Sequence, residues 1–180
     1  MAFTLKEVVL WGRSFDEYVK MFTLTDDDFK SNILGCSDGP ASFNAILSRQ
    51  GGDVVSIDPI YQFTDDAIKN RISETYDQVI EQTRKNRNEF VWNSISSVEE
   101  LGQVRMAAMN EFLNDFKNGK AQGRYLTGGF PRLPFRDGQF GLSLCSHYLF
   151  LYSEQLSIEF HVEAIKKCVV WQGNQGYFPF

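Results

Sequence analysis

Two short apolar segments, joined by a glycine-containing turn and a helix, constrain the fold of this chain more than any other feature. The brief apolar run 31–34 breaks into the turn Gly35 to Gly39, and a helix of about three turns is predicted from Pro40 to the stop at Gly51. The β-branched run Val54 to Ile57 is predicted to be the second strand. Residues 31–58 therefore form a βαβ unit with parallel strands, which indicates an α/β fold.

The length of 180 residues fits a single domain, 1–180. Hydrophobic spacing divides it into an N-terminal helical segment (1–30), the βαβ unit (31–58), a pair of amphipathic helices (64–119), and the remaining sheet with a last helix (124–180). Ser14 and Glu17 have the spacing of a capping box, which predicts a short helix in the first segment. We expect an open, mostly parallel sheet with helices on both faces.

Two long helices occupy the connection after the second strand, where one crossover helix would be enough. Ser97 and Glu100 form a second capping-box pair at the start of the later helix. The pair is therefore predicted to be a helical insertion. It either covers a ligand site near the strand ends or serves only as additional scaffold.

The C-terminal third contains two further strands and one helix. Arg124 to Thr127 is a weak third strand, and Phe140 to Cys145 alternates as a half-buried strand should. Ser157 is the expected cap of a last helix whose apolar positions are Ile158, Val162, Ile165 and Val169. The tail Trp171 to Phe180 has room for one more short strand.

Composition excludes several classes of protein. The chain has 18 Lys and Arg against 23 Asp and Glu, and a net charge of -5 is the wrong sign for binding nucleic acid. Its three cysteines show no CxxC spacing, so neither a disulfide framework nor a metal site is expected. No apolar stretch approaches the roughly 20 residues of a membrane span, and the start lacks a signal peptide. These features predict a cytoplasmic protein without a membrane partner.

The ligand site of an open parallel sheet lies beyond the carboxyl ends of its strands, which here is the turn Gly35 to Gly39. Asp58 ends the second strand about 20 residues later, the position from which a carboxylate commonly binds ribose hydroxyls. Together they favour nucleoside binding. The dinucleotide fingerprint GxGxxG is absent, because Ser37 and Pro40 occupy its second and third glycines, and this disfavours a hydride-transfer enzyme.

Three segments, spread over about residues 30–168, occur in the order typical of one family. They are Gly35-Cys36-Ser37-Asp38-Gly39, Ser56-Ile57-Asp58-Pro59, and Leu133-Pro134-Phe135-Arg136-Asp137 followed by Phe140 and the strand to Cys145-Ser146-His147. In these segments the chain resembles the class I, Rossmann-like S-adenosylmethionine-dependent methyltransferases. It departs from their pattern at Ile33 and Gly141, where the family usually has acids.

This resemblance implies that the cofactor is S-adenosyl-L-methionine. The implied site residues are Gly35, Cys36, Ser37 and Gly39 at its methionine part, Asp58 at the ribose, Gly129 and Phe130 at the adenine, and Cys145 at the sulfonium. The partner would be a methyl acceptor, a small molecule or another substrate, that the sequence does not identify.

Methyl transfer depends mainly on alignment, because the sulfonium methyl is already activated. An acceptor that must lose a proton also needs a base, and His147 is the candidate, with a hydrogen-bonded structural histidine as the alternative. His161, on the last helix, is expected to pack in the core. A nucleophilic pair of Cys145 and His147 is disfavoured, because such partners normally come from distant segments.

The C-terminal part is shorter than the resemblance implies. Family members continue through three more strands, whereas this chain ends at Phe180, so we expect C-terminal strands to be missing. The exposed sheet edge would then be covered by the aromatic tail or pair with a second copy of the chain.

The sequence thus favours a methyltransferase with an unidentified acceptor. Two alternatives stay open. One is a catalytically inactive adenosyl-binding or interaction module, and the other is a nucleotide-binding oxidoreductase.

Overall fold

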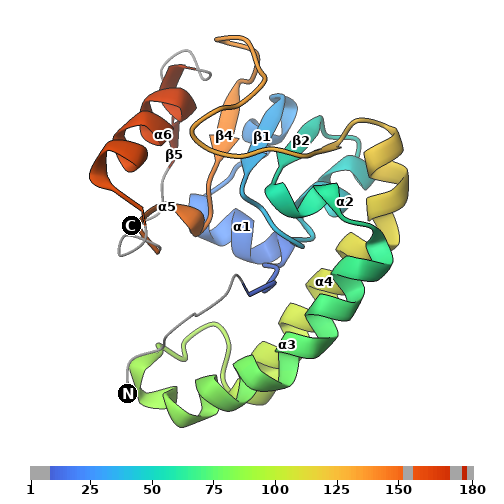
Figure 1. Ribbon diagram of the computed structural model, residues 1–180, viewed down its shortest axis with the longest axis vertical. Coiled ribbons are helices and arrows are strands. Elements are labelled where there is room, and N and C mark those ends of the chain that lie inside the picture. The colour runs from blue at the N-terminus through green and yellow to red at the C-terminus, as the bar shows by residue number, and fades with distance from the viewer. Residues whose placement is uncertain (1–8, 152–155, 171–175, 178–180) are drawn as a thin grey trace.

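A computed structural model describes residues 9–151, 156–170 and 176–177 of the chain (Figure 1). In chain order its main elements are α1 (Phe15–Phe22), β1 (Ile33–Cys36), α2 (Phe43–Arg49), β2 (Val54–Ile57), α3 (Asp65–Lys85), α4 (Val98–Ala121), β3 (Tyr125–Leu126), β4 (Leu142–Leu144), α5 (Tyr148–Leu151), α6 (Ile158–Val170) and β5 (Gly176–Tyr177). Short 3-10 helices η1 (Asp28–Lys30), η2 (Pro59–Gln62) and η3 (Arg87–Glu89) lie between them. The five strands form one sheet in the order β3-β2-β1-β4-β5, and every neighbouring pair is parallel. The predicted α/β fold with a Rossmann-like open sheet is confirmed.

Helices cover both faces of the sheet. On one face Ile33 of β1 packs with Phe43 of α2 and with the aromatic side chains of α1. On the other face Leu34 packs with Ala164 and with other residues of α6. The two neighbours Ile33 and Leu34 lie in different layers because successive residues of a strand point to opposite faces. Each fully buried side chain of this size contributes about 1.5–3 kcal/mol to folding.

The βαβ unit is present, but two of its predicted boundaries are wrong. Strand β1 continues through Gly35 and Cys36, which pair in register with β2, so the turn begins only at Ser37. Helix α2 begins at Phe43 and not at Pro40. The backbone N–H of the preceding residue, Ser42, donates to the carbonyl oxygen of Arg13 at 3.0 Å, so a tertiary contact holds the chain in place just before the helix starts.

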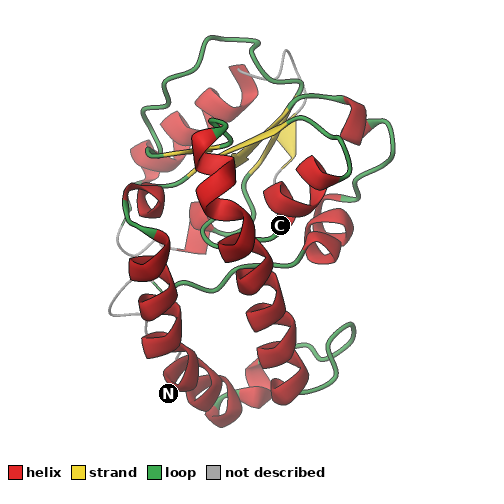
Figure 2. Ribbon diagram, turned by 90° about the vertical axis from the view of Figure 1, so that its right-hand side faces the viewer, coloured by secondary structure: helices red, strands yellow, loops and turns green. Residues whose placement is uncertain are grey.

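The helical insertion is confirmed as a pair of contacting helices, α3 and α4, between β2 and β3. Figure 2 shows the two helices extending together away from the sheet. Gly102 permits their close approach, because a Cβ atom there would lie 2.4 Å from the hydroxyl oxygen of Tyr76. At the start of α4 the Ser97 hydroxyl accepts from the N–H of Glu100, whereas the Glu100 carboxylate accepts from Ser96. The predicted capping box is therefore only half formed.

Two predictions about the C-terminal elements need correction. Strand β4 is buried at all three of its residues rather than at alternate ones, because it lies between β1 and β5 and is covered on both faces. The apolar stripe predicted for α6 is rotated, since Ile158 is 74% and Val162 43% exposed. The buried positions are His161, Ala164 and Cys168, so His161 does pack in the core as expected.

At both ends of the described chain, the structure contains elements that the sequence predicted. The capping box of Ser14 and Glu17 is fully formed at the start of α1. Strand β5 is the short strand expected within the tail 171–180, and the rest of that tail lies outside the described residues. In the ranges that the structure describes, no helix is long and apolar enough to cross a membrane.

Candidate functional site

The order of the strands locates the first candidate site. From β1 the sheet grows in one direction to β2 and β3 and in the other to β4 and β5, so its switch point lies between β1 and β4. Ligands of open α/β sheets bind in the crevice beyond the carboxyl ends of the strands at this point. The turn 37–39 follows β1 and residues 145–147 follow β4, so the structure brings both sequence-predicted segments to this edge.

Asp58 connects the end of β2 to the turn after β1. One carboxylate oxygen accepts from the backbone N–H of Gly39 at 2.9 Å, and the other accepts from Ile60 at the same distance. Burial raises the pKa of Asp58 despite these hydrogen bonds, and the residue is only 7% exposed. Because a carboxylate can accept about four hydrogen bonds, each oxygen keeps capacity for one more donor.

Two glycines, Gly39 in the turn and Gly35 in β1, leave space for different reasons. Gly39 has a φ of 56°, and no atom lies within 4 Å of where its Cβ would be, so open space adjoins the backbone there. At Gly35 a Cβ would lie 1.8 Å from a carboxylate oxygen of Asp38. In the segment predicted as the turn, Gly39 therefore leaves open space beside the loop, and Gly35 leaves room for the buried carboxylate of Asp38.

Asp38 is a central residue that the sequence analysis did not single out. Its carboxylate is buried under the turn, where it accepts from the hydroxyls of Tyr18 at 2.7 Å and Ser56 at 2.6 Å. Burial raises the pKa of Asp38 to about 6, although both hydroxyls act in the opposite direction. Within the described part of the chain neither Asp38 nor Asp58 forms an ion pair with Lys or Arg.

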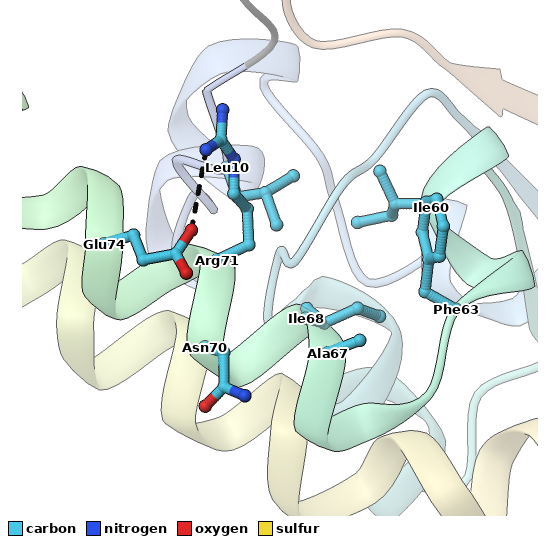
Figure 3. Close-up of a pocket in the computed structure, with 8 residues that line it drawn as sticks. All are labelled: Leu10, Ile60, Phe63, Ala67, Ile68, Asn70, Arg71 and Glu74. Atoms are coloured by element: carbon cyan, nitrogen blue, oxygen red, sulfur yellow. Dashed lines mark ion pairs between the residues drawn. The ribbon is translucent and has the colours of Figure 1, made fainter.

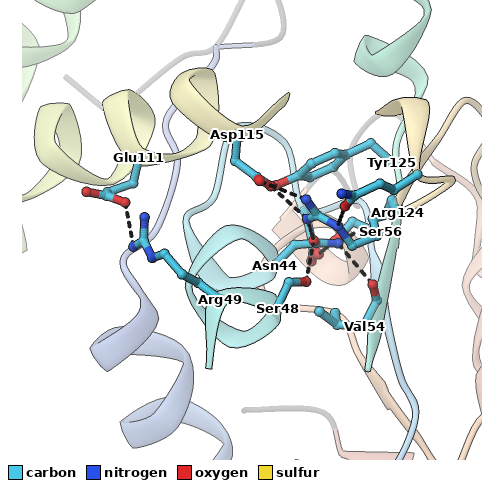
Figure 4. Close-up of polar contacts among 11 residues, drawn as sticks. Asn44, Ser48, Arg49, Val54, Ser56, Glu111, Asp115, Arg124 and Tyr125 are labelled. Atoms are coloured by element: carbon cyan, nitrogen blue, oxygen red, sulfur yellow. Dashed lines mark hydrogen bonds and ion pairs between the residues drawn. The ribbon is translucent and has the colours of Figure 1, made fainter. Parts of the chain in front are cut away.

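Ser56, one of the donors to Asp38, belongs to a polar network with Asn44 and Arg124 (Figure 4). The amide of Asn44 in α2 donates to Ser56 Oγ at 3.1 Å, and its oxygen accepts from Arg124 at 2.6 Å. Arg124 in turn holds both carboxylate oxygens of Asp115 at 2.7 Å. These hydrogen bonds outweigh burial and lower the pKa of Asp115. The network ties the turn to α4.

Two of the predicted site residues, Cys36 and Cys145, have their side chains in the hydrophobic core. The side chains of Cys36 and Cys145 pack with Cys168 in the apolar layer against α6. A hydrogen bond with Cys168 and burial raise the pKa of Cys36, and burial raises that of Cys145 to about 12. Both thiols are therefore protonated at neutral pH, and only the backbone of these residues lies at the strand ends.

His147 lies beside Ser146, whose hydroxyl contacts its Nδ1 at 2.7 Å. Burial lowers the pKa of His147 to about 4, helped by the positive charges of Arg13 and Arg105. The imidazole is therefore neutral at pH 7. Its contact with Ser146, together with the protonated thiol of Cys145, does not match a nucleophilic cysteine–histidine pair.

The loop after β3 reaches the end of β2, as the predicted adenine contact requires. A Cβ at Gly129 would lie 3.3 Å from Pro59, the residue after Asp58. Phe130 is partly buried and packs against the layer that contains Ile57. Gly129 and Phe130 are thus near the second strand end, on the side of Asp58 away from the β1–β4 switch point.

A separate pocket of about 410 Å³ adjoins η2, directly after Asp58 (Figure 3). It is lined by Leu10, Ile60, Phe63, Ala67, Ile68, Asn70, Arg71 and Glu74. Figure 3 shows Ile60 and Phe63 on one side and Leu10 with Arg71 on the other. Most of the lining is apolar, and its polar groups come from α3, so the helical insertion contributes a wall to this cavity.

The segment before α1 closes over the outer side of the glycine turn. A Cβ at Gly12 would lie 2.0 Å from the carbonyl oxygen of Pro40, so the two backbones are in direct contact. The Ser42 hydroxyl accepts from the N–H of Phe15 at 3.0 Å. This contact brings Arg13 and Glu17 to the same edge of the sheet, and sequence spacing gave no sign of it.

Long-range contacts account for most residues that the sequence analysis missed. Tyr18, Asn44 and Ser56 looked like ordinary helix and strand positions, and their polar atoms meet only after folding. The one local signal was Asp38 itself, an acid inside a glycine turn. Over the residues that the structure describes, no three metal-ligating side chains lie together in a way that could hold an ion.

Comparisons with known proteins identify a relative in an archaeon. No protein-family model matches the sequence, and no solved structure matches it. The chain is 34% identical over 176 residues to the uncharacterized protein MJ0045 of Methanocaldococcus jannaschii, a match that covers 97% of this chain and 79% of the archaeal protein. This chain therefore belongs to the same protein family as that archaeal protein.

Proposed function

We propose that this chain is a cytoplasmic S-adenosylmethionine-dependent methyltransferase. The observation that carries the proposal is the hydrogen bond between Asp58 at the end of β2 and Gly39 in the turn after β1. A carboxylate held against a glycine turn in this way combines a ribose acceptor with open space beside a backbone. The resemblance of three sequence segments to class I methyltransferases supports the same ligand.

The residues at this edge fit an adenosyl cofactor. Asp58 has capacity for the ribose hydroxyls, and the space at Gly39 admits a ligand to the turn. Gly129 and Phe130 would contact the adenine. Asp38 is a buried carboxylate that has no cationic partner among the described residues, so its charge would favour binding of the positively charged methionine part of the cofactor. When bound, the cofactor supplies a methyl group that its sulfonium already activates.

The contribution of the chain to transfer is mainly alignment and exclusion of water. The acceptor atom would form a bond to the methyl carbon as the bond from carbon to sulfur breaks, and sulfur would keep that electron pair. His147 is the group that could receive a proton from the acceptor. Its pKa of about 4 makes it a weak base, so we expect acceptors whose attacking atom needs little proton removal.

Calorimetric titration tests the proposal directly. The wild-type protein should bind S-adenosylmethionine and S-adenosylhomocysteine, and it should not bind NAD. Asp58→Asn should weaken binding of S-adenosylhomocysteine by about 1.5–3 kcal/mol, because a charged acceptor to the ribose is lost. Asp53→Asn is the matched control, since the exposed Asp53 lies at the opposite end of the same strand.

The outcomes separate the alternatives. Binding of NAD alone would favour the oxidoreductase. Binding of the adenosyl compounds with no methyl transfer to any tested acceptor would favour the inactive module. Equal affinities in Asp58→Asn and Asp53→Asn, with both proteins folded, would move the site away from Asp58.

A further inference from the structure

A largely buried cluster of positive charge lies beside the candidate site, and the proposed function does not use it. Arg105 of α4 and Arg13 both contact the carboxylate of Glu17 in α1, Arg13 at 3.5 Å between Nη1 and Oε1. Arg105 is only 5% exposed. Two guanidinium groups share one carboxylate, so this cluster carries a net charge of about +1 at neutral pH.

The cluster lacks one hydrogen-bond acceptor. The Nε atom of Arg105 is buried and has no hydrogen-bond partner among the described residues. A buried donor without a partner costs about 1–3 kcal/mol, more when the group is charged. Burial lowers the pKa of Arg13, and the positive charge of Arg105 lowers it further. Both observations indicate a place where an anion would be stabilised.

Helix α1 connects this cluster to the candidate site. Glu17 and Tyr18 are neighbours in α1, and while Glu17 holds the two arginines, the hydroxyl of Tyr18 contacts Ser146 at 3.2 Å. Ser146 contacts His147, the candidate proton acceptor, at 2.7 Å. The positive charges of Arg13 and Arg105 add to burial in lowering the pKa of His147.

We propose that Arg13 and Arg105 bind a carboxylate of the methyl acceptor and hold it beside His147. A single carboxylate matches the cluster's net charge, whereas a phosphate dianion would reverse it. Arginine suits this role because its planar group binds carboxylates through two parallel hydrogen bonds. The inference rests on the proposed methyl transfer for the identity of the ligand as an acceptor. The anion site itself stands on the geometry of the arginines.

Binding of benzoate at constant ionic strength tests the anion site without any adenosyl compound. Wild type should bind benzoate, with neutral benzamide of the same shape as the control, and inorganic phosphate should bind more weakly. Arg105→Gln should lower the affinity for benzoate about tenfold or more. Arg13 is partly exposed, so Arg13→Gln provides a second variant if the buried substitution prevents folding. Equal affinity for benzoate in wild type and a folded arginine variant would overturn the proposal.

Glu17→Gln gives a test with the opposite sign. Glutamine keeps most of the capping geometry but removes the internal negative charge, so affinity for benzoate should rise severalfold. A fall in affinity would contradict the proposed role of net charge.

The cofactor's own carboxylate is the competing source of an anion. If the acceptor uses the cluster, Arg105→Gln should leave the affinity for S-adenosylhomocysteine unchanged, and benzoate should still bind when that compound is saturating. Weaker binding of S-adenosylhomocysteine with normal binding of 5'-methylthioadenosine, which lacks a carboxylate, would assign the arginines to the cofactor instead. If wild type binds neither adenosyl compound, the proposed function fails, while the benzoate titration still decides the anion site.

Discussion

Two buried charged regions lie at the same edge of the sheet, and they satisfy their charges in opposite ways. In the acidic region, Asp38 and Asp58 accept hydrogen bonds from hydroxyls and backbone N–H groups, and no cation pairs with them among the described residues. In the basic region, Arg13 and Arg105 surround Glu17, which neutralises only one of them. Neutral dipoles stabilise one region, and an incomplete ion pair stabilises the other.

The difference shows that the two regions do not neutralise each other. Burial is the largest cause of the raised pKa of Asp38, and no arginine acts to lower it. Tyr18 connects the regions, because it donates to Asp38 and contacts Ser146 beside the histidine that the arginines affect. The edge thus holds separated negative and positive charge, which suits ligands that carry both signs.

Gly35→Ala should have the largest effect, because it destroys the acidic region. The new Cβ would lie 1.8 Å from an oxygen of Asp38, so the buried carboxylate would have to leave its hydroxyl partners. We expect a loss of roughly 3–5 kcal/mol in the free energy of unfolding, measured by urea denaturation. The double variant Gly35→Ala with Asp38→Ala should recover part of this loss. Independent, additive losses would show that the clash is not the cause.

Asp38→Asn should change how stability depends on pH. The pKa of Asp38 is about 6 in the folded protein and near 3.8 when unfolded, so the folded state binds the proton more tightly. Its stabilising contribution is complete below pH 3.8 and is lost as pH rises through 6. Relative to the asparagine variant, wild type should therefore lose up to about 3 kcal/mol between pH 4 and pH 7. If the difference between the two unfolding free energies stays constant over this range, the pKa of Asp38 is not raised in the folded protein.

Tyr18→Phe should have the smallest effect, since it removes only the link between the regions. The variant keeps the ring packing against Phe43 but deprives Asp38 of a donor, so we expect a loss of about 1–2 kcal/mol at pH 7. The pKa of Asp38 should rise further because a hydrogen bond that lowers it is gone. An NMR titration of the Asp38 carboxyl carbon measures this shift. Phe22→Leu, in the same helix, serves as a packing control that leaves the hydrogen bond intact.

The sequence predicted the architecture well where local signals specify it. β-Branched runs, capping residues and helical periodicity located α1, β2, α3 and α4, and the βαβ unit required a parallel sheet. The failures occurred where a neighbouring element decides the outcome. The start of α2 depends on the contact between Ser42 and Arg13, and the buried face of α6 depends on how that helix lies on the sheet.

By itself the sequence determined that a glycine-containing turn follows the first strand and that the carboxylate of Asp58 follows the second, because both follow from short spacings within one βαβ unit. Only the tertiary structure decided that the buried carboxylate of Asp38 accepts a hydrogen bond from Tyr18, and that Arg105 of the helical insertion forms an ion pair with Glu17. These partners lie 20 and 88 residues apart in the chain. No local pattern encodes such pairs, since they form only when the helices pack onto the sheet and exclude water from the charges between them.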